Sequence, residues 1–288
     1  MSNAKKVLVT GATGQQGGAV ARQLLARGHA VRGMTRNVDS DASKALIELG
    51  AEMVTGDFED GASLIAVMTG VDAVYAMSTP FEAGEEAEVR QGRALVDAAV
   101  AASVPHFVYS SVASANLETG IPHFDSKYEI EKYLATTDLP WTVVAPVYFM
   151  ENLFFPQNLD GLRGGAYAIP MPAGVPLQQV AVADIGAFGA HVIERGDELI
   201  GRRIDIAGDE LNATDTATAL GGVLSREVGS FEVPIQQIRS FSEDMALMYE
   251  WFVSTGYSVD IDELRSEFSD VKWHRYSDWA TGSVPAAL

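Results

Sequence analysis

Three glycines near the start of the chain have the spacing of an anion-binding loop. Gly11, Gly14 and Gly17 follow the apolar run Val7-Leu8-Val9 in the pattern G-x-x-G-x-x-G and precede a segment with helical periodicity. One glycine of such a loop permits a tight turn, one lets the main chain approach a diphosphate, and one lets helix and strand pack closely. Because the helix N-terminus also presents free N–H groups and a positive dipole end, the pattern predicts a dinucleotide site.

A cation follows the second apolar run. Where a site that prefers NAD usually places an acidic residue to bind the ribose 2′-hydroxyl, this chain has Arg36, and the next acidic residue is Asp39. A guanidinium offers a planar fork of donors that suits a 2′-phosphate. We therefore predict NADP(H), with a solvated charge at the strand end as the other interpretation of Arg36.

Two further strand ends point to the same ligand. Asp57 and Phe58 follow the third apolar run, where Asp57 could accept a hydrogen bond from the adenine amine and Phe58 could cover the ring. The alternative is a plain turn in which the aspartate caps the next helix. Met77 ends the fourth run, and we expect it along the middle of the cofactor.

Short apolar runs alternate with amphipathic segments through the first half of the chain. We expect strands at 7–10, 30–35, 52–55, 73–77, 107–110 and 141–145, and helices at 14–26, 42–49, 61–68, 85–102 and 123–136. This βαβ succession predicts an α/β Rossmann fold, a doubly wound and mostly parallel sheet whose ligands bind beyond the carboxyl ends of the strands.

The alternation breaks after residue 146. We expect an irregular segment over 152–174, a strand at 179–182, a helix at 184–193, a strand at 203–207 and two or three helices from Asn212 onward. The predicted division is a dinucleotide-binding domain over 1–152, rejoined by about 179–209. A smaller C-terminal α/β subdomain would comprise 153–178 and 210–288.

Composition narrows the classes of function. The chain has 288 residues, no cysteine and a formal net charge of −19. The acidic surface disfavours direct nucleic-acid binding, and the missing cysteines exclude disulfides and thiolate nucleophiles. The polar N-terminus and the lack of an apolar run of about 18 residues predict a soluble cytoplasmic protein without a membrane partner, a monomer or homodimer. No histidine or acidic cluster has metal-ligand spacing, so we expect no metal.

Several segments together resemble the NmrA-like family of atypical short-chain dehydrogenase/reductases. They are VTGATGQQGGAVARQLL (9–25), RGMTRN (32–37), GDFED (56–60), PHFDSKYEIEKYL (122–134), APVYFMENL (145–153), VADIG (182–186) and MYEWFVSTGY (248–257). The resemblance implies a seven-stranded Rossmann sheet and NADP(H) binding. It implies a phosphate loop of Gly11, Thr13, Gly14, Gln15, Gln16 and Gly17, a 2′-phosphate position at Arg36 and Asn37, and an adenine position at Asp57 and Phe58.

The catalytic pair of related dehydrogenases is only half present. They use Tyr-x-x-x-Lys, in which lysine lowers the pKa of the tyrosine and holds the nicotinamide ribose. Here Lys127 matches the lysine, but His123 stands in the tyrosine's place, one helical turn away on the same face. His123 is one candidate acid, and its other interpretation is a helix-start residue that caps or contacts solvent. Ser110 and Ser111 end the fifth strand and either take part in chemistry or fix the strand end.

The sixth strand leads to a second candidate acid. Pro146 would face the nicotinamide amide, Tyr148 is the phenol placed to reach that region, and Asn152, Phe154 and Phe155 would begin a pocket wall. An apolar set in a C-terminal helix is more typical of core than of a substrate pocket: Met245, Met248, Tyr249, Trp251 and Phe252.

Two functions remain open. The first is an NADPH-dependent reductase of a small apolar or aromatic acceptor such as a quinone, which needs less proton assistance than a ketone. The alternative is a non-catalytic NADPH/NADP⁺ sensor that acts through a regulatory protein partner.

Overall fold

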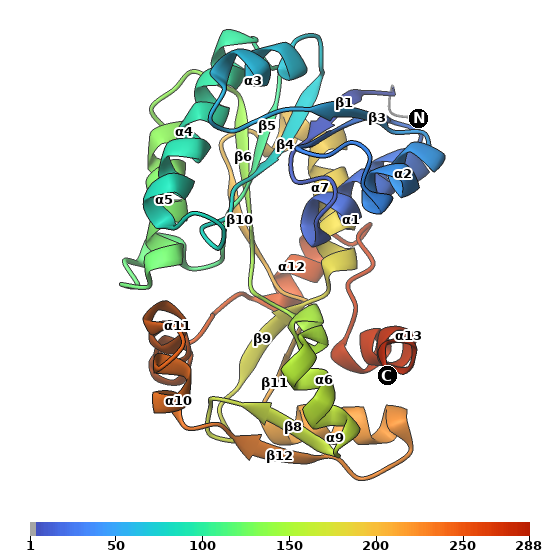
Figure 1. Ribbon diagram of the computed structural model, residues 1–288, viewed down its shortest axis with the longest axis vertical. Coiled ribbons are helices and arrows are strands. Elements are labelled where there is room, and N and C mark those ends of the chain that lie inside the picture. The colour runs from blue at the N-terminus through green and yellow to red at the C-terminus, as the bar shows by residue number, and fades with distance from the viewer. Residues whose placement is uncertain (1–3) are drawn as a thin grey trace. The chain divides into compact units, whose positions relative to one another are not determined.

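The main element of the protein is a seven-stranded sheet, in a computed structural model that describes residues 4–288 (Figure 1). The strand order is β10-β6-β5-β4-β1-β2-β3, and β1 pairs in parallel with both β2 and β4. The strands are β1 (Lys6–Val9), β2 (Ala30–Thr35), β3 (Glu52–Thr55), β4 (Ala73–Met77), β5 (Phe107–Ser110), β6 (Trp141–Pro146) and β10 (Arg203–Ile206). Because the chain winds outward from β1 in both directions, the order reverses at β1, which confirms the predicted Rossmann fold.

Helices cover both faces of this sheet. Its helical segments are α1 (Gln15–Ala26), α2 (Asp41–Glu48), α3 (Gly61–Met68), α4 (Glu85–Ala101), α5 (Pro122–Leu134), α7 (Val182–Glu194), α8 (Gly196–Leu199) and the 3₁₀ turn η1 (Ala115–Leu117). Leu64, Leu95 and Ile130 bring α3, α4 and α5 into one core cluster with Val74 of β4. The neighbouring strand residue, Tyr75, faces the opposite way toward α7, where a Cβ on Gly189 would lie 3.0 Å from its ring.

The chain divides into two compact units. The first contains 4–118, 122–145 and 185–205 of the described residues, and the second contains 119–121, 146–184 and 206–288. The domain boundaries expected from the sequence, at 152, 179 and 209, stay predictions. The sequence predicts a polar N-terminus, and its residues 1–3 lie outside the described residues.

The second unit is built from two small sheets and short helices. One sheet has the order β11-β9-β7, and the other pairs β12 with β8 in parallel. The strands are β7 (Tyr148–Phe149), β8 (Ala166–Ile169), β9 (Leu177–Val180), β11 (Asp209–Leu211) and β12 (Gly229–Glu232). The helices are η2 (Met150–Phe154), α6 (Pro156–Arg163), α9 (Ala213–Leu224), α10 (Ile235–Arg239), α11 (Glu243–Ser254), α12 (Ile261–Glu267) and α13 (Tyr276–Ala287).

Two expectations for this half are wrong. Residues 152–174 are not irregular, because Pro156 starts α6 at a position that suits its fixed φ, and β8 follows. The region after Asn212 holds five helices and a strand rather than two or three helices. The five-residue α10 and seven-residue α12 are too short to show helical periodicity in a sequence window.

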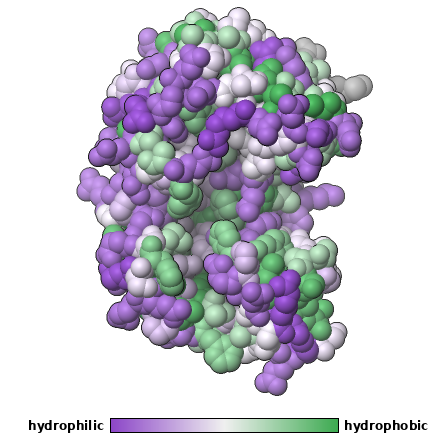
Figure 2. All heavy atoms as spheres, in the orientation of Figure 1, coloured by the Kyte–Doolittle hydropathy of each residue, from purple (hydrophilic) through white to green (hydrophobic). Residues whose placement is uncertain are grey.

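The face of the protein drawn in Figure 2 is largely polar. On the face drawn in Figure 2, hydrophilic residues predominate and hydrophobic ones lie scattered between them, in keeping with the net charge of −19. No helix within residues 4–288 has both the length and the apolar composition that a membrane crossing demands.

Candidate functional site

The three glycines form a tight loop between β1 and α1. Gly11 has φ +57°, and a Cβ there would lie 2.7 Å from the Met77 sulfur. A Cβ on Gly17 would lie 2.4 Å from the Gly11 carbonyl oxygen, so the helix can approach the loop this closely only with glycine at 17. The Gly14 N–H donates to the Gly11 carbonyl at 2.9 Å, which closes the turn.

The start of α1 is open to an anion. Its N-cap, Gly14, makes no side-chain capping hydrogen bond, and the first turn contains no acidic residue. Thr13 and Gln15 lie on this partly exposed loop and first turn, while Gln16 accepts a hydrogen bond from the Ser110 hydroxyl at 2.8 Å. The positive end of the helix dipole therefore meets no competing carboxylate from its own first turn.

Two hydrogen bonds join the end of strand β4 to Thr10, which directly precedes the glycine loop. The Thr10 hydroxyl accepts from the Met77 N–H at 2.8 Å and donates to the Met77 carbonyl at 3.1 Å. This pair of bonds fixes Met77 beside Gly11. As the sequence predicts, Met77 ends β4, and its place along the middle of the cofactor stays a prediction.

Arg36 lies at the end of β2 with its guanidinium extended. Its two terminal nitrogens each contact one carboxylate oxygen of Glu82 at 2.9 Å, in a bidentate pair with 73% and 57% of the two side chains exposed. Asn37, beside it, shapes the turn into α2: its Oδ1 accepts from the Asp39 N–H at 3.0 Å and its carbonyl accepts from the Ser43 hydroxyl at 2.9 Å.

The loop after β3 carries Asp57 and Phe58. The Asp57 carboxylate accepts from the Glu59 N–H at 3.0 Å, and its own N–H donates to the Ser63 hydroxyl at 3.2 Å. Asp60, not Asp57, caps α3. Phe58 is half-buried against the core cluster, so one side of its ring is already covered. An adenine role for Asp57 and Phe58 stays a prediction.

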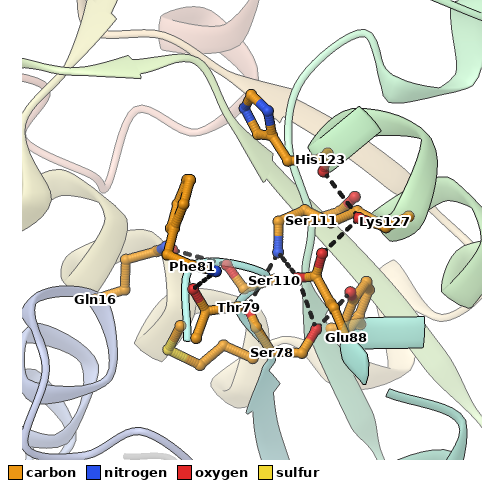
Figure 3. Close-up of polar contacts among 12 residues, drawn as sticks. Gln16, Ser78, Thr79, Phe81, Glu88, Ser110, Ser111, His123 and Lys127 are labelled. Carbon is orange, nitrogen blue, oxygen red and sulfur yellow. Dashed lines mark hydrogen bonds and ion pairs between the residues drawn. The ribbon is translucent and has the colours of Figure 1, made fainter. Parts of the chain in front are cut away.

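Lys127 is held at the α4–α5 contact. Its ammonium donates to the Glu88 carboxylate at 2.7 Å and to the Ser78 carbonyl at 3.1 Å (Figure 3). Glu88 is fully buried and also accepts from the hydroxyls of Ser78 at 3.1 Å and Ser126 at 2.5 Å. The lysine therefore faces a buried carboxylate on one side and keeps 13% of its side chain exposed.

His123 lies one turn before Lys127, as predicted, but it does not face solvent. The residue is 7% exposed, and its ring lies 4.8 Å from that of Phe124 and 5.8 Å from that of Phe81. At this exposure the ring has little contact with solvent, and the choice between an acid and a helix-start residue stays a prediction. Phe81 itself is 74% exposed on the connection between β4 and α4.

The two serines that end β5 point to different partners. Ser110 bonds Gln16 of α1, and the Ser111 hydroxyl donates to the buried Glu131. Arg203 also binds Glu131, at 2.8 Å, and the carbonyl of Val112, at 2.8 Å. Each serine thus joins the end of β5 to a side chain of a helix, and a part in chemistry stays a prediction. Burial raises the pKa of Glu131 above its usual value, and the positive charge of Arg203 opposes part of that rise.

Pro146 and Tyr148 belong to the second unit. Pro146 is buried, and the Tyr148 hydroxyl lies 3.2 Å from that of Tyr249 in α11. Burial raises the pKa of Tyr148 above the ordinary tyrosine value. The phenol is protonated near neutrality, as an unperturbed tyrosine would be. Met248, Tyr249 and Phe252 are buried, in line with their interpretation as core residues.

Two of the three residues expected to begin a pocket wall after β7 contact other residues of the second unit. The Phe154 ring lies 5.4 Å from that of Trp279, Asn152 accepts through its carbonyl from Asn158 at 2.8 Å, and Phe155 is 48% exposed. Trp279 also donates to Glu151 at 2.8 Å. These contacts fasten η2 to α13.

Two carboxylates at this site escaped the sequence reasoning. Glu88 had a signal, because it lies on the same face of α4 as the buried Gly92, Leu95 and Val96 and so stands as a charge on an apolar stripe. Glu82 had none, since its contact with Arg36 depends on the path of a loop. Within residues 4–288 no group of His, Asp and Glu side chains could hold a metal ion.

Comparison with known proteins identifies the family. A model of the NmrA-like family matches residues 3–281. The chain belongs to the NmrA-like family. It is 28% identical over 269 residues to an NmrA-like family domain-containing protein of Dictyostelium discoideum, with 88% of each chain covered. It is 36% identical over 177 residues to the oxidoreductase notA of an Aspergillus species, which covers 57% of this chain and 52% of that one. The match thus spans about half the length of the fungal oxidoreductase.

Solved structures share the whole fold. NmrA, a negative transcriptional regulator solved with NADP, superimposes with a TM-score of 0.82 at 21% identity, covering 98% of this chain and 96% of that one. The triphenylmethane reductase of a Citrobacter species, solved with NADP(H), gives 0.81 at 23% identity and covers 98% and 100%. The Escherichia coli quinone oxidoreductase QOR2, solved with NADPH, gives 0.80 at 23% identity and covers 96% and 99%.

Proposed function

We propose that this NmrA-like protein binds NADP(H) through the glycine loop and Arg36. The observation that carries the proposal is the pairing of an uncapped helix N-terminus behind Gly11 and Gly17 with a guanidinium fork at the end of the adjacent strand. The loop would hold the diphosphate and Arg36 the 2′-phosphate. Three structural neighbours support this choice of ligand. NmrA was solved with NADP, the triphenylmethane reductase with NADP(H) and the quinone oxidoreductase with NADPH.

The residues present fit such a ligand. A Cβ at Gly11 would collide with the Met77 sulfur and one at Gly17 with the Gly11 carbonyl, so the loop can keep this tight shape at the start of α1 only with glycine at both positions. Arg36 already holds a bidentate carboxylate, so its fork is oriented for an anion with two oxygens to share. Asn37, Asp57, Phe58, Met77 and Pro146 complete the proposed cofactor-binding set, together with Thr13, Gln15 and Gln16.

We further propose that the protein is an NADPH-dependent reductase of a small apolar or aromatic acceptor. Bound NADPH would supply a hydride, and the acceptor would take it together with a proton. Lys127 has three N–H donors, of which Glu88 and Ser78 take two, so one remains to hold the nicotinamide ribose. The likeness to the Citrobacter triphenylmethane reductase and the E. coli quinone oxidoreductase supports an aromatic acceptor.

His123 and Tyr148 are the proposed proton donors. His123 is one helical turn from Lys127 and lies beside the exposed Phe81 ring. Tyr148 carries a phenolic proton near neutrality, as an ordinary tyrosine does, and burial raises its pKa further. Ser110 is proposed to orient the acceptor, although its hydroxyl bonds Gln16 in this structure.

A spectrophotometric assay of NADPH oxidation tests the reductase. Purified protein is offered a panel of benzoquinones, naphthoquinones and a triphenylmethane dye, with Lys127→Met as the matched variant. We expect saturable turnover with at least one acceptor and a clear loss in the variant. No turnover above buffer with any acceptor, in protein that binds NADPH, would reject the reductase and leave cofactor binding standing.

The alternative proposal is a sensor of the NADPH/NADP⁺ ratio. The absent tyrosine favours it, as does the likeness to NmrA, a negative transcriptional regulator. A ligand shifts a conformational equilibrium only through differential affinity. Calorimetry with both forms tests the sensor, which requires different affinities or a ligand-specific change in protease sensitivity. Equal affinity without such a change would exclude it.

A further inference from the structure

Glu82 occupies the donors that a 2′-phosphate would need. Both of its carboxylate oxygens lie 2.9 Å from terminal nitrogens of Arg36, so the carboxylate takes the bidentate fork through which a guanidinium recognises phosphate oxygens. An anion already in that fork must leave or share the donors before a second anion can bind.

The position of the pair in the sheet places it beside the glycine loop. Arg36 follows β2 and Glu82 follows β4, and these two strands flank β1 on opposite sides. The pair therefore links the connections on either side of the strand that ends in Gly11. The same connection after β4 carries Phe81, whose ring reaches that of His123 at 5.8 Å.

We propose that Glu82 is a specificity-determining residue that competes with the 2′-phosphate for Arg36. The inference rests on the proposed NADP(H) site and deepens it. When NADP(H) binds, its 2′-phosphate displaces the carboxylate from the guanidinium. When NAD(H) binds, its 2′-hydroxyl carries no charge, and the Arg36–Glu82 pair remains closed. Glu82 therefore narrows the gap in affinity between the two coenzymes.

The size of the effect follows from the exposure of the pair. The apparent affinity is the intrinsic affinity multiplied by the fraction of molecules in the binding-competent state. Here that state is the one in which Arg36 is not paired with Glu82. Solvent-exposed ion pairs shift such equilibria by up to about fivefold. Glu82→Gln keeps the side-chain shape and removes the charge, so we expect the NADP⁺ dissociation constant to fall about two- to fivefold. The NAD⁺ constant should not fall.

Isothermal titration calorimetry with NADP⁺, NAD⁺, adenosine 2′,5′-bisphosphate and AMP tests the proposal. Adenosine 2′,5′-bisphosphate and AMP contain only the adenosine end of NADP⁺ and NAD⁺. Glu82→Gln should therefore raise the affinity for the bisphosphate and should not raise the affinity for AMP. Glu86→Gln is the matched control, because it removes the same charge from an exposed position four residues along the chain. It should leave the ratio of the two affinities unchanged.

A double variant decides whether Glu82 acts through Arg36. In the Arg36→Gln background, Glu82→Gln should gain less NADP⁺ affinity than it does in the wild type, because no guanidinium is left to compete for. An equal gain in both backgrounds, an equal gain for NADP⁺ and NAD⁺, or no gain in NADP⁺ affinity would each overturn the role of Glu82. A wild-type protein that binds no pyridine nucleotide would instead reject the proposed function itself.

Discussion

Removing the charge of Glu88 should destabilise the protein, because this carboxylate is the counter-ion of Lys127. Glu88 is fully buried in α4 and accepts from Lys127 at 2.7 Å, while Ser78 and Ser126 donate to it from two other segments. Glu88→Gln keeps the volume but leaves the ammonium without a counter-charge in a site where its side chain is 13% exposed.

The cost can be worked from this geometry. Removing one partner of a buried ion pair costs about 3–5 kcal/mol, since the other charge is left uncompensated. The residual exposure of Lys127 places the expected loss at the lower end, about 3 kcal/mol. In a domain of this size such a loss lowers the melting temperature by roughly 6–12 °C.

Urea denaturation followed by circular dichroism measures the loss. Glu86→Gln, on the exposed side of the same helix, is the control and should stay within about 0.5 kcal/mol of the wild type. Replacing both charges, as Glu88→Leu with Lys127→Met, should cost less than Glu88→Gln alone, because no unpaired charge remains. A Glu88→Gln protein as stable as the Glu86→Gln control would refute this account of the pair.

Three further outcomes follow from other contacts. Arg36→Asp should weaken NADP⁺ binding by about tenfold or more, because a charge-assisted hydrogen bond becomes a repulsion. NAD⁺ binding should weaken much less. Competition calorimetry measures both affinities, and equal losses for the two coenzymes would contradict the assignment. Gly17→Ala should abolish detectable coenzyme binding, because its Cβ would lie 2.4 Å from the Gly11 carbonyl oxygen; a variant that still binds NADPH normally would show that the loop relaxes freely. Burial raises the pKa of Glu151 above its usual 4.5, so the folded state takes up its proton first and the unfolding free energy falls as pH rises from 4.5 through the folded pKa. Glu151→Gln should flatten that slope when unfolding is followed by tryptophan fluorescence, and an unchanged slope would mean that other groups set it.

The sequence predicts the first unit of the fold well because its signals are local. The apolar runs of β1, β4, β5 and β6 are largely buried in a parallel sheet. The close contacts at Gly14 and Gly17 are with the Gly11 carbonyl, a few residues away in the sequence. Lys127 and His123 are one turn apart in α5, so their shared face follows from helical periodicity alone.

The contacts that the sequence does not reveal join distant residues. The Arg36–Glu82 pair spans 46 positions and depends on the path of the connection after β4. The Tyr148–Tyr249 contact spans 101 positions and requires α11 to be placed. Burial of Glu88 required knowing which charge on α4 lies against α5, and burial of His123 required the positions of Phe81 and Phe124.

Calorimetric titration of the wild-type protein with NADPH and NADH tests the central claim most directly. The account predicts saturable one-site binding of NADPH, with weaker binding of NADH because Arg36 loses its phosphate partner. Absence of binding heat for either coenzyme, or tighter binding of NADH than of NADPH, would contradict it.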